Sequence, residues 1–284
     1  ALLEAADCRV IAVDRDPYAK IYAQNLMDKY AKRFTLVPGR FSNLDSIIAD
    51  YGLRHVDGVI FDVGVSSMQI DTPRRGFSFT HDGPLDMRMN DEEGKSAADV
   101  VNTYSEEELA GIIFKFGDER MSRKIAAAIV AARSREQITR TSQLASIIRS
   151  VVGRYNDTID PATRTFQALR IWVNDELNEL VRGLYAAEKI LSVGGRLAVI
   201  TFHSGEDKIV KDFLKERSSA AGEGFSRYQP PIEPINQIKP TFKLINTKVI
   251  TASEAELSEN PRARSAKLRG AVRTDAQNWN GGTA

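Results

Sequence analysis

The most constraining feature of this sequence is an apolar run that ends on a carboxylate and opens into a long segment without helical or strand periodicity. The run is VDGVIFD, ending at Asp62, and the aperiodic segment continues to Met89. A segment of this length is usually either a functional loop or disordered. Apolar anchors argue against a solvated linker. The segment carries Phe77, Phe79, Leu85, Met87 and Met89. We therefore predict an ordered active-site loop at the carboxyl end of a buried strand, where open α/β sheets bind ligands.

The flanking regions alternate between strand-like and helix-like patterns. This alternation predicts an α/β fold with a mostly parallel sheet and helices on both faces. Gly194-Gly195 predicts a turn, and a Gly- and Pro-rich stretch at 222–240 predicts a surface loop. The predicted strands are 9–13, 34–37, 56–61, 196–202, 243–251 and 265–273, and the predicted helices are 18–30, 43–51, 180–191 and 206–217.

Residues 96–182 differ, because their patterns are mainly helical. We predict a helical insert there, with residues 1–95 and 183–284 forming the sheet domain. Ser105 begins a Ser-Glu-Glu-Glu sequence that fits a capping box, and Thr141-Ser142 offers a second N-cap. The predicted helices of the insert are 106–116, 120–133, 142–152 and 163–178.

Composition restricts the class of protein. No run of eighteen apolar residues exists, so no membrane span is indicated. The single cysteine, Cys8, excludes an internal disulfide framework and favours a reducing compartment. The three histidines are scattered without metal-ligand spacing, so we predict no metal site.

Positive charge is concentrated in two regions although the net charge is only +1. Residues 115–170 hold 11 Lys/Arg against 5 Asp/Glu, and residues 261–273 hold five basic residues and no acid. Such surfaces favour a polyanionic partner. Solvated helix faces would have the same composition, so both interpretations stay open.

Asp14 ends the first predicted strand. In Rossmann units, an acidic residue at this place accepts hydrogen bonds from ribose hydroxyls and lies about 20 residues after a Gly-rich turn. The first glycine here is Gly39, so that turn would lie before Ala1. Either the chain is an N-terminal truncation, or Asp14 is only a turn residue.

Asp62 is the stronger candidate for a ligand contact. It is followed by small residues that let a ligand approach the backbone: Gly64, Ser66 and Ser67. The alternative is an Asx-turn at a strand end. Asp71 and Asp82 are expected to order the loop. His203 and Ser204 end another predicted strand, and His203 could orient a substrate or take a proton. A structural, hydrogen-bonded histidine is an equal alternative.

Several long motifs follow one another in order and together resemble the RsmH/MraW family. They are DGVIFDVGVSSMQIDTPRRGFSF, HDGPLDMRM, AADVVN, TRTFQALRIWVNDELNEL, GGRLAVITFHSGEDKIVKDF and NPRARSAKLR. The resemblance spans residues 9–273. It implies a class I (Rossmann-like) methyltransferase sheet with a helical insert. It also implies S-adenosylmethionine as cofactor and formation of N4-methylcytidine in the decoding region of small-subunit ribosomal RNA. The family has bacterial and mitochondrial members, so the expected location is the bacterial cytoplasm or the mitochondrial matrix.

Carried over motif by motif, the cofactor contacts of the family fall on Asp14, Phe41, Asp62 and Gln69. Two departures accompany the resemblance. The Gly-Gly-His turn of the family is missing before Leu2, and Gly205 stands where a leucine is usual.

The exocyclic amine of cytosine is a poor nucleophile, so positioning must supply much of the rate. A polar acceptor near the amine can take its proton. The candidates are Asp86, His203 and Ser204, although Asp86 could instead pair with Arg88.

The expected partner is small-subunit ribosomal RNA in an assembled subunit, because RNA recognition usually needs a displayed loop or strand. Arg164 and Arg170 are weaker candidates for RNA contacts, because they could pair with acids of the same predicted helix, such as Glu176. The predicted RNA contacts are Arg123, Lys124, Arg133, Arg262, Arg264 and Lys267. Two other classes of protein stay open: an NAD-dependent Rossmann enzyme, and a non-catalytic RNA-binding or ribosome-assembly factor.

Overall fold

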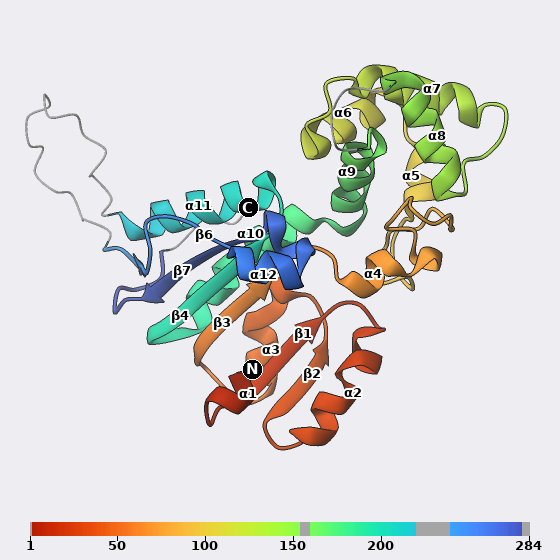
Figure 1. Cartoon of the computed structure of the whole chain (residues 1–284). Helices are drawn as coiled ribbons and strands as arrows, with labels where there is room; N and C mark the ends of the chain where they lie inside the picture. The colour runs from red at the N-terminus through yellow and green to blue at the C-terminus, as the bar shows by residue number, and fades with distance from the viewer. Residues whose placement is uncertain (1, 154–159, 220–238, 280–284) are drawn as a thin grey trace, which may run out of the picture. The chain divides into compact units, whose positions relative to one another are not determined.

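The structure is a computed structural model that describes residues 2–153, 160–219 and 239–279 (Figure 1). The chain divides into two compact units. The first comprises residues 1–39 and 65–176, and the second comprises residues 40–64 and 177–284. The boundaries predicted at residues 96 and 182 are not decided by this division and stay a prediction.

The first unit begins with a short helix and a βαβ element. After α1 (Leu2–Ala5), the strands β1 (Val10–Asp14) and β2 (Phe34–Pro38) pair in parallel, connected by α2 (Ala19–Lys29). The apolar, β-branched residues of β1 suit a pleated, half-buried surface. Asp14 is the last residue of β1, so the predicted strand end is confirmed.

The predicted loop is ordered and contains two short helical turns, α4 (Ser67–Asp71) and η2 (Pro73–Arg75). Its apolar anchors are buried in the core of the first unit, and Phe79 packs against that core. Met87 is fully buried. Burial of these side chains explains how so long an aperiodic segment keeps one conformation.

The remainder of the first unit is helical. Its helices are α5 (Ala97–Thr103), α6 (Glu106–Gly117), α7 (Ser122–Arg133), α8 (Thr141–Val152) and α9 (Ala162–Asn174). The capping box at Ser105 is confirmed, with Glu108 as its second member. The N-cap predicted at Thr141-Ser142 is wrong. Arg140 is the N-cap, since Thr141 is already helical and fully buried. The predicted helix 163–178 is interrupted because Asp175 is left-handed, with φ of 52°.

The second unit contains a five-stranded mixed sheet with the order β3-β4-β7-β5, in which β6 also pairs with β7. β3 and β4 are parallel, whereas β7 runs antiparallel to β4 and β5. Its helices are η1 (Phe41–Asn43), α3 (Leu44–Asp50), α10 (Glu176–Ile190), α11 (Ser204–Ser218), α12 (Glu254–Glu259) and η3 (Pro261–Ser265). Its strands are β3 (Val56–Asp62), β4 (Leu191–Thr201), β5 (Phe242–Leu244), β6 (Ile250–Thr251) and β7 (Lys267–Arg273).

Two predictions in this unit are wrong in detail. The turn predicted at Gly194-Gly195 lies inside β4, where Gly194 has φ of 82° and the pairing with β3 shifts register. The glycines therefore make an irregularity in a longer strand. The strand predicted at 243–251 is broken into β5 and β6. The loop predicted at 222–240 lies almost entirely outside the described residues.

The α/β prediction is confirmed, and both parallel pairs have the predicted strands. The prediction of a mostly parallel sheet is wrong for the second unit, where β7 pairs antiparallel with β4, β5 and β6. Within the described parts of the chain, β1 pairs only with β2, and β3 pairs only with β4. No helix in those parts is long and apolar enough to cross a membrane.

Candidate active site

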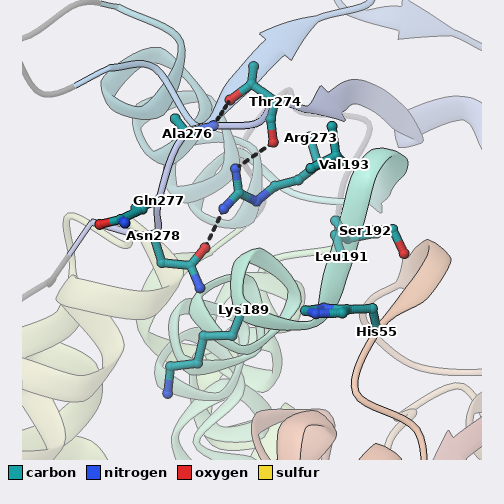
Figure 2. Close-up of a pocket in the computed structure, with 10 residues that line it drawn as sticks. All are labelled: His55, Lys189, Leu191, Ser192, Val193, Arg273, Thr274, Ala276, Gln277 and Asn278. Atoms are coloured by element: carbon teal, nitrogen blue, oxygen red, sulfur yellow. Dashed lines mark hydrogen bonds between the residues drawn. The ribbon is translucent and has the colours of Figure 1, made fainter.

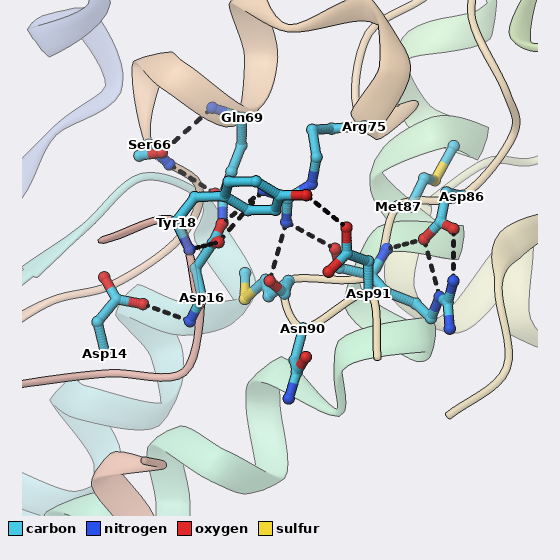
Figure 3. Close-up of polar contacts among 12 residues, drawn as sticks. Asp14, Asp16, Tyr18, Ser66, Gln69, Arg75, Asp86, Met87, Asn90 and Asp91 are labelled. Carbon is cyan, nitrogen blue, oxygen red and sulfur yellow. Dashed lines mark hydrogen bonds and ion pairs between the residues drawn. The ribbon is translucent and has the colours of Figure 1, made fainter. Parts of the chain in front are cut away.

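Two carboxylates stand at strand ends, one in each unit. In the first unit, Oδ1 of Asp14 accepts a hydrogen bond of 2.8 Å from the backbone N–H of Asp16 (Figure 3). Desolvation raises the pKa of Asp14, although this N–H opposes the rise. A carboxylate offers about four acceptor positions, so Asp14 can still accept hydrogen bonds from ribose hydroxyls.

Asp62 ends β3 in the second unit. Desolvation also raises the pKa of its carboxyl group. Among the described residues, no side chain or backbone group forms a hydrogen bond or an ion pair with this carboxylate. Gly64 follows with φ of 98°, a conformation that glycine adopts without strain. Asp62 is exposed, so its carboxylate is accessible to water or to a ligand.

Phe41 begins η1 in the same unit. Its ring lies 5.4 Å from that of Phe61, centroid to centroid, at an interplanar angle of 52°. Gly183 of α10 lies close to both rings, and a β-carbon there would stand 2.6 Å from Cδ2 of Phe41. The place of the Phe41 ring therefore depends on the absence of a side chain at position 183.

Gln69 is bonded at both ends of its amide. Its Oε1 accepts from the backbone N–H of Ser66 at 2.9 Å, which completes the capping box of α4. Its Nε2 donates to Oδ2 of Asp16 at 2.7 Å. The amide keeps one further N–H for a ligand. In this arrangement Gln69 also holds Asp16 in place.

The loop that contains Asp86 is held by an ion pair. Nη2 of Arg88 lies 2.7 Å from Oδ2 of Asp86, and Nε donates to Oδ1 at 2.9 Å. The backbone N–H of Arg88 donates to the same Oδ1 at 3.0 Å. The hydrogen-bonded carboxylate raises the pKa of Arg88. The pairing that the sequence left open is therefore present, and it keeps Asp86 oriented as an acceptor.

His203 is the N-cap of α11. Its Nδ1 accepts from the backbone N–H groups of Gly205 and Glu206, at 3.2 and 3.4 Å. We therefore assign its proton to Nε2, which lies 3.1 Å from Oε1 of Glu206 without the alignment of a hydrogen bond. The structural alternative for His203 is thus present, and acting as a base would require Nδ1 to leave the helix end. Ser204, the first residue of α11, is exposed.

The predicted RNA contacts differ in exposure, and two of the less exposed ones bond to other residues of the protein. Arg133 donates to the backbone oxygen of Val101 at 2.6 Å, and Lys267 pairs with Asp207 at 3.3 Å. Arg170 pairs with Glu176 at 2.8 Å, as the alternative proposed, and Arg164 lies 3.9 Å from Glu119. The exposed members are Arg123, Lys124, Arg262 and Arg264.

Sequence reasoning missed three buried polar residues that form the hydrogen bonds beneath the predicted loop: Asp16, Arg75 and Asn174. Arg75 pairs with Asp16 at 2.9 Å, and Asn174 bonds the backbone of the predicted loop. Asp16 stands two residues after Asp14, and Arg75 directly follows Arg74, so each has a near neighbour of the same residue type. Composition gives no sign of which member of such a pair is buried.

A pocket of about 410 Å³ lies in the second unit (Figure 2). It is lined by His55, Leu191, Val193 and Arg273 among others. The guanidinium of Arg273 already bonds Asn278 and the backbone oxygens of Thr241 and Thr274. None of the predicted site residues lines this pocket, so it is not the candidate site.

Strands that end on carboxylates in an α/β fold are typical of the Rossmann-like class of cofactor-binding proteins. Residues 1–274 match the model of the MraW methylase family, and the chain belongs to this family. It is 54% identical over 279 residues to the ribosomal RNA small subunit methyltransferase H of Paramagnetospirillum magneticum, covering 98% of this chain and 87% of that protein. Proteins of the same name from Rhodospirillum centenum and Rhodopseudomonas palustris are each 55% identical, over 97% of this chain and 83% and 81% of theirs.

Proposed function

We infer that this protein transfers a methyl group from S-adenosylmethionine to small-subunit ribosomal RNA. The observation that carries this conclusion is the match of nearly the whole chain to a methylase family whose similar members are named for that substrate. No feature of these relatives favours the non-catalytic alternative, and their name gives no support to a nicotinamide-dependent enzyme. The finer proposal is that the methyl acceptor is N4 of a cytidine in the decoding region, within an assembled small subunit.

The residues present are suited to the cofactor. S-adenosylmethionine carries an electrophilic methyl group on a sulfonium and supplies it when bound. In the first unit, we propose that Asp14 accepts ribose hydroxyls and that Gln69 contributes its remaining N–H. In the second unit, Asp62 offers an exposed carboxylate that bonds to no other described residue, and Phe41 offers an aromatic ring. The raised pKa values of Asp14 and Asp62 support this, since perturbed carboxyl groups cluster at functional sites.

Asp86 is the preferred acceptor for the amine proton among the three candidates. The ion pair with Arg88 keeps the carboxylate of Asp86 oriented while leaving it partly exposed. His203 is engaged as a helix cap, so we propose that it acts mainly by placing Ser204 and the start of α11. A hydrogen bond from the amine to Asp86 would favour the tetrahedral nitrogen, and the carboxylate would then accept the proton.

We propose that the helical part of the first unit and the segment containing Arg262 and Arg264 contact RNA phosphates. Arg123 and Lys124 support this, because both are exposed near the start of α7. The relatives named above are bacterial, which favours the bacterial cytoplasm, where such subunits are assembled, as the place of action. No observation favours the mitochondrial matrix.

The test is methyl transfer from tritiated S-adenosylmethionine to free ribosomal RNA, assembled small subunits and duplex DNA. We expect transfer to the subunits in preference to the other two. Preference for DNA would contradict the RNA proposal, and binding of subunits without any transfer would favour the assembly-factor alternative.

A further inference from the structure

The side chain of Arg75 connects two parts of the first unit that the proposed function uses separately. Its Nη1 donates to Oδ2 of Asp16 at 2.9 Å and to Oδ1 at 3.2 Å. Its Nη2 donates to the backbone oxygens of Arg88 and Met89, at 3.0 and 2.8 Å. One buried guanidinium thus joins the turn that follows Asp14, the last residue of β1, to the loop 86–90 (Figure 3).

Asn174, the last residue of α9, makes a second connection between the same parts. Its side chain donates to the backbone oxygen of Met87 at 2.7 Å and accepts from the N–H of Met89 at 2.8 Å. Its backbone oxygen accepts from Nη1 of Arg15 at 2.7 Å. The side chain is almost fully buried, and its hydrogen bonds replace those that a neighbouring strand would give to residues 87–89.

Between these connections, Met87 adopts a left-handed conformation with φ of 64°. This is an unfavourable conformation for a residue with a β-carbon, and it persists only where the surroundings hold it. Here its N–H donates to the backbone oxygen of Arg75 at 3.0 Å, and its oxygen is held by Asn174. The residues that hold Met87 therefore also determine where the adjacent Asp86 lies.

We propose that Arg75 and Asn174 are positioning residues that lock the loop 86–90 to the turn carrying Asp14. The inference rests on the proposed function, in which Asp14 binds the cofactor and Asp86 receives the target amine. Arg75 is buried against protein atoms only, so it acts through the loop and the turn. Loss of the lock should lower the rate of methyl transfer while each substrate still binds, because a displacement of about 1 Å in the reacting groups costs roughly 100-fold in rate.

The decisive variant is Arg75→Lys in the full chain. A lysine keeps the positive charge but cannot reach Asp16 and both backbone oxygens with a planar fork. The matched control is Arg74→Lys, the same change at the exposed neighbouring residue. For each protein, calorimetry gives the Kd for S-adenosylmethionine, filter binding gives the Kd for small subunits, and a single-turnover assay at saturating concentrations gives the rate.

We expect Arg75→Lys to lower the single-turnover rate by about 100-fold with both Kd values within about threefold of the wild type, and the control rate within about twofold. An unchanged rate, or a loss confined to either Kd, would overturn the proposal. If Arg75→Lys does not fold, Asp16→Asn tests the same lock with an isosteric change, and the expected loss is again in the rate. Absence of transfer by the wild type would instead contradict the proposed function.

Discussion

Gly183 lies directly against the ring of Phe41, so that a β-carbon at position 183 would stand 2.6 Å from Cδ2 of that ring. Gly183→Ala should therefore displace Phe41, although alanine is favoured over glycine in a helix by up to about 1 kcal/mol. We expect the affinity for S-adenosylmethionine, measured by calorimetry, to fall about tenfold, which corresponds to about 1.4 kcal/mol.

The control for this change is Gly111→Ala in α6, where a β-carbon would meet no atom within 4 Å. That variant should gain about 0.5–1 kcal/mol in unfolding free energy and bind the cofactor normally. Unchanged cofactor affinity in Gly183→Ala, despite a lower Tm, would mean that Phe41 serves packing alone.

The ionised carboxylate of Asp62 is expected to lower the free energy of unfolding at neutral pH, although it favours cofactor binding. Its pKa in the folded state is raised above the ordinary value of 3.8, so the folded protein holds this proton more tightly than the unfolded chain. The corresponding stability is present below pH 4 and is lost as the pH rises through the raised pKa. Asp62→Asn should thus raise the Tm slightly at pH 7 but not at pH 4.

The same variant should abolish detectable cofactor binding by calorimetry. In the wild type, affinity should decrease as the pH is lowered through the raised pKa values of Asp14 and Asp62. Asp57→Asn, at an exposed position of the same strand, is the control and should alter neither property. Retained binding by Asp62→Asn would remove Asp62 from the site.

Arg123 and Lys124 are predicted to contribute electrostatically to RNA binding. Replacing both with alanine should weaken binding to small subunits and reduce the slope of log K against log salt by about 1 for each phosphate that is no longer neutralised. Cofactor affinity should not change. Lys20→Ala combined with Lys32→Ala removes the same charge from exposed positions elsewhere in the first unit. An equal effect of that control would show that net charge alone is responsible.

Arg133 should behave differently from its neighbours on α7, because its guanidinium donates to the backbone oxygen of Val101. Arg133→Ala removes the donor from a part-buried carbonyl, so we expect a loss of about 1–3 kcal/mol in the free energy of unfolding. Arg135→Ala, at an exposed position, should cost less than about 0.5 kcal/mol. Equal stability of the two variants in urea titrations would return Arg133 to the group of RNA contacts.

Local patterns predicted much of the fold and part of the site. A strand that ends on Asp62, apolar anchors in the loop and the capping box at Ser105 can all be recognised from neighbouring residues, and the structure has each of them. The network around Asp16 could not be predicted in this way. Arg75 lies 59 positions from Asp16, and Asn174 lies 85 positions from Met89, so no local period relates them. The turn predicted at Gly194 is wrong because a glycine pair suits a turn and a strand irregularity equally well.

The most direct measurement of the central claim is identification of the methylated nucleoside. Small subunits that lack the modification are incubated with the protein and S-adenosylmethionine, and the digested RNA is analysed by mass spectrometry, with Asp62→Ala as the inactive control. We expect one new N4-methylcytidine per subunit, located in the decoding region and absent with the variant. A methyl group on another nucleoside or on a ribosomal protein, or the same yield with Asp62→Ala, would contradict the central claim.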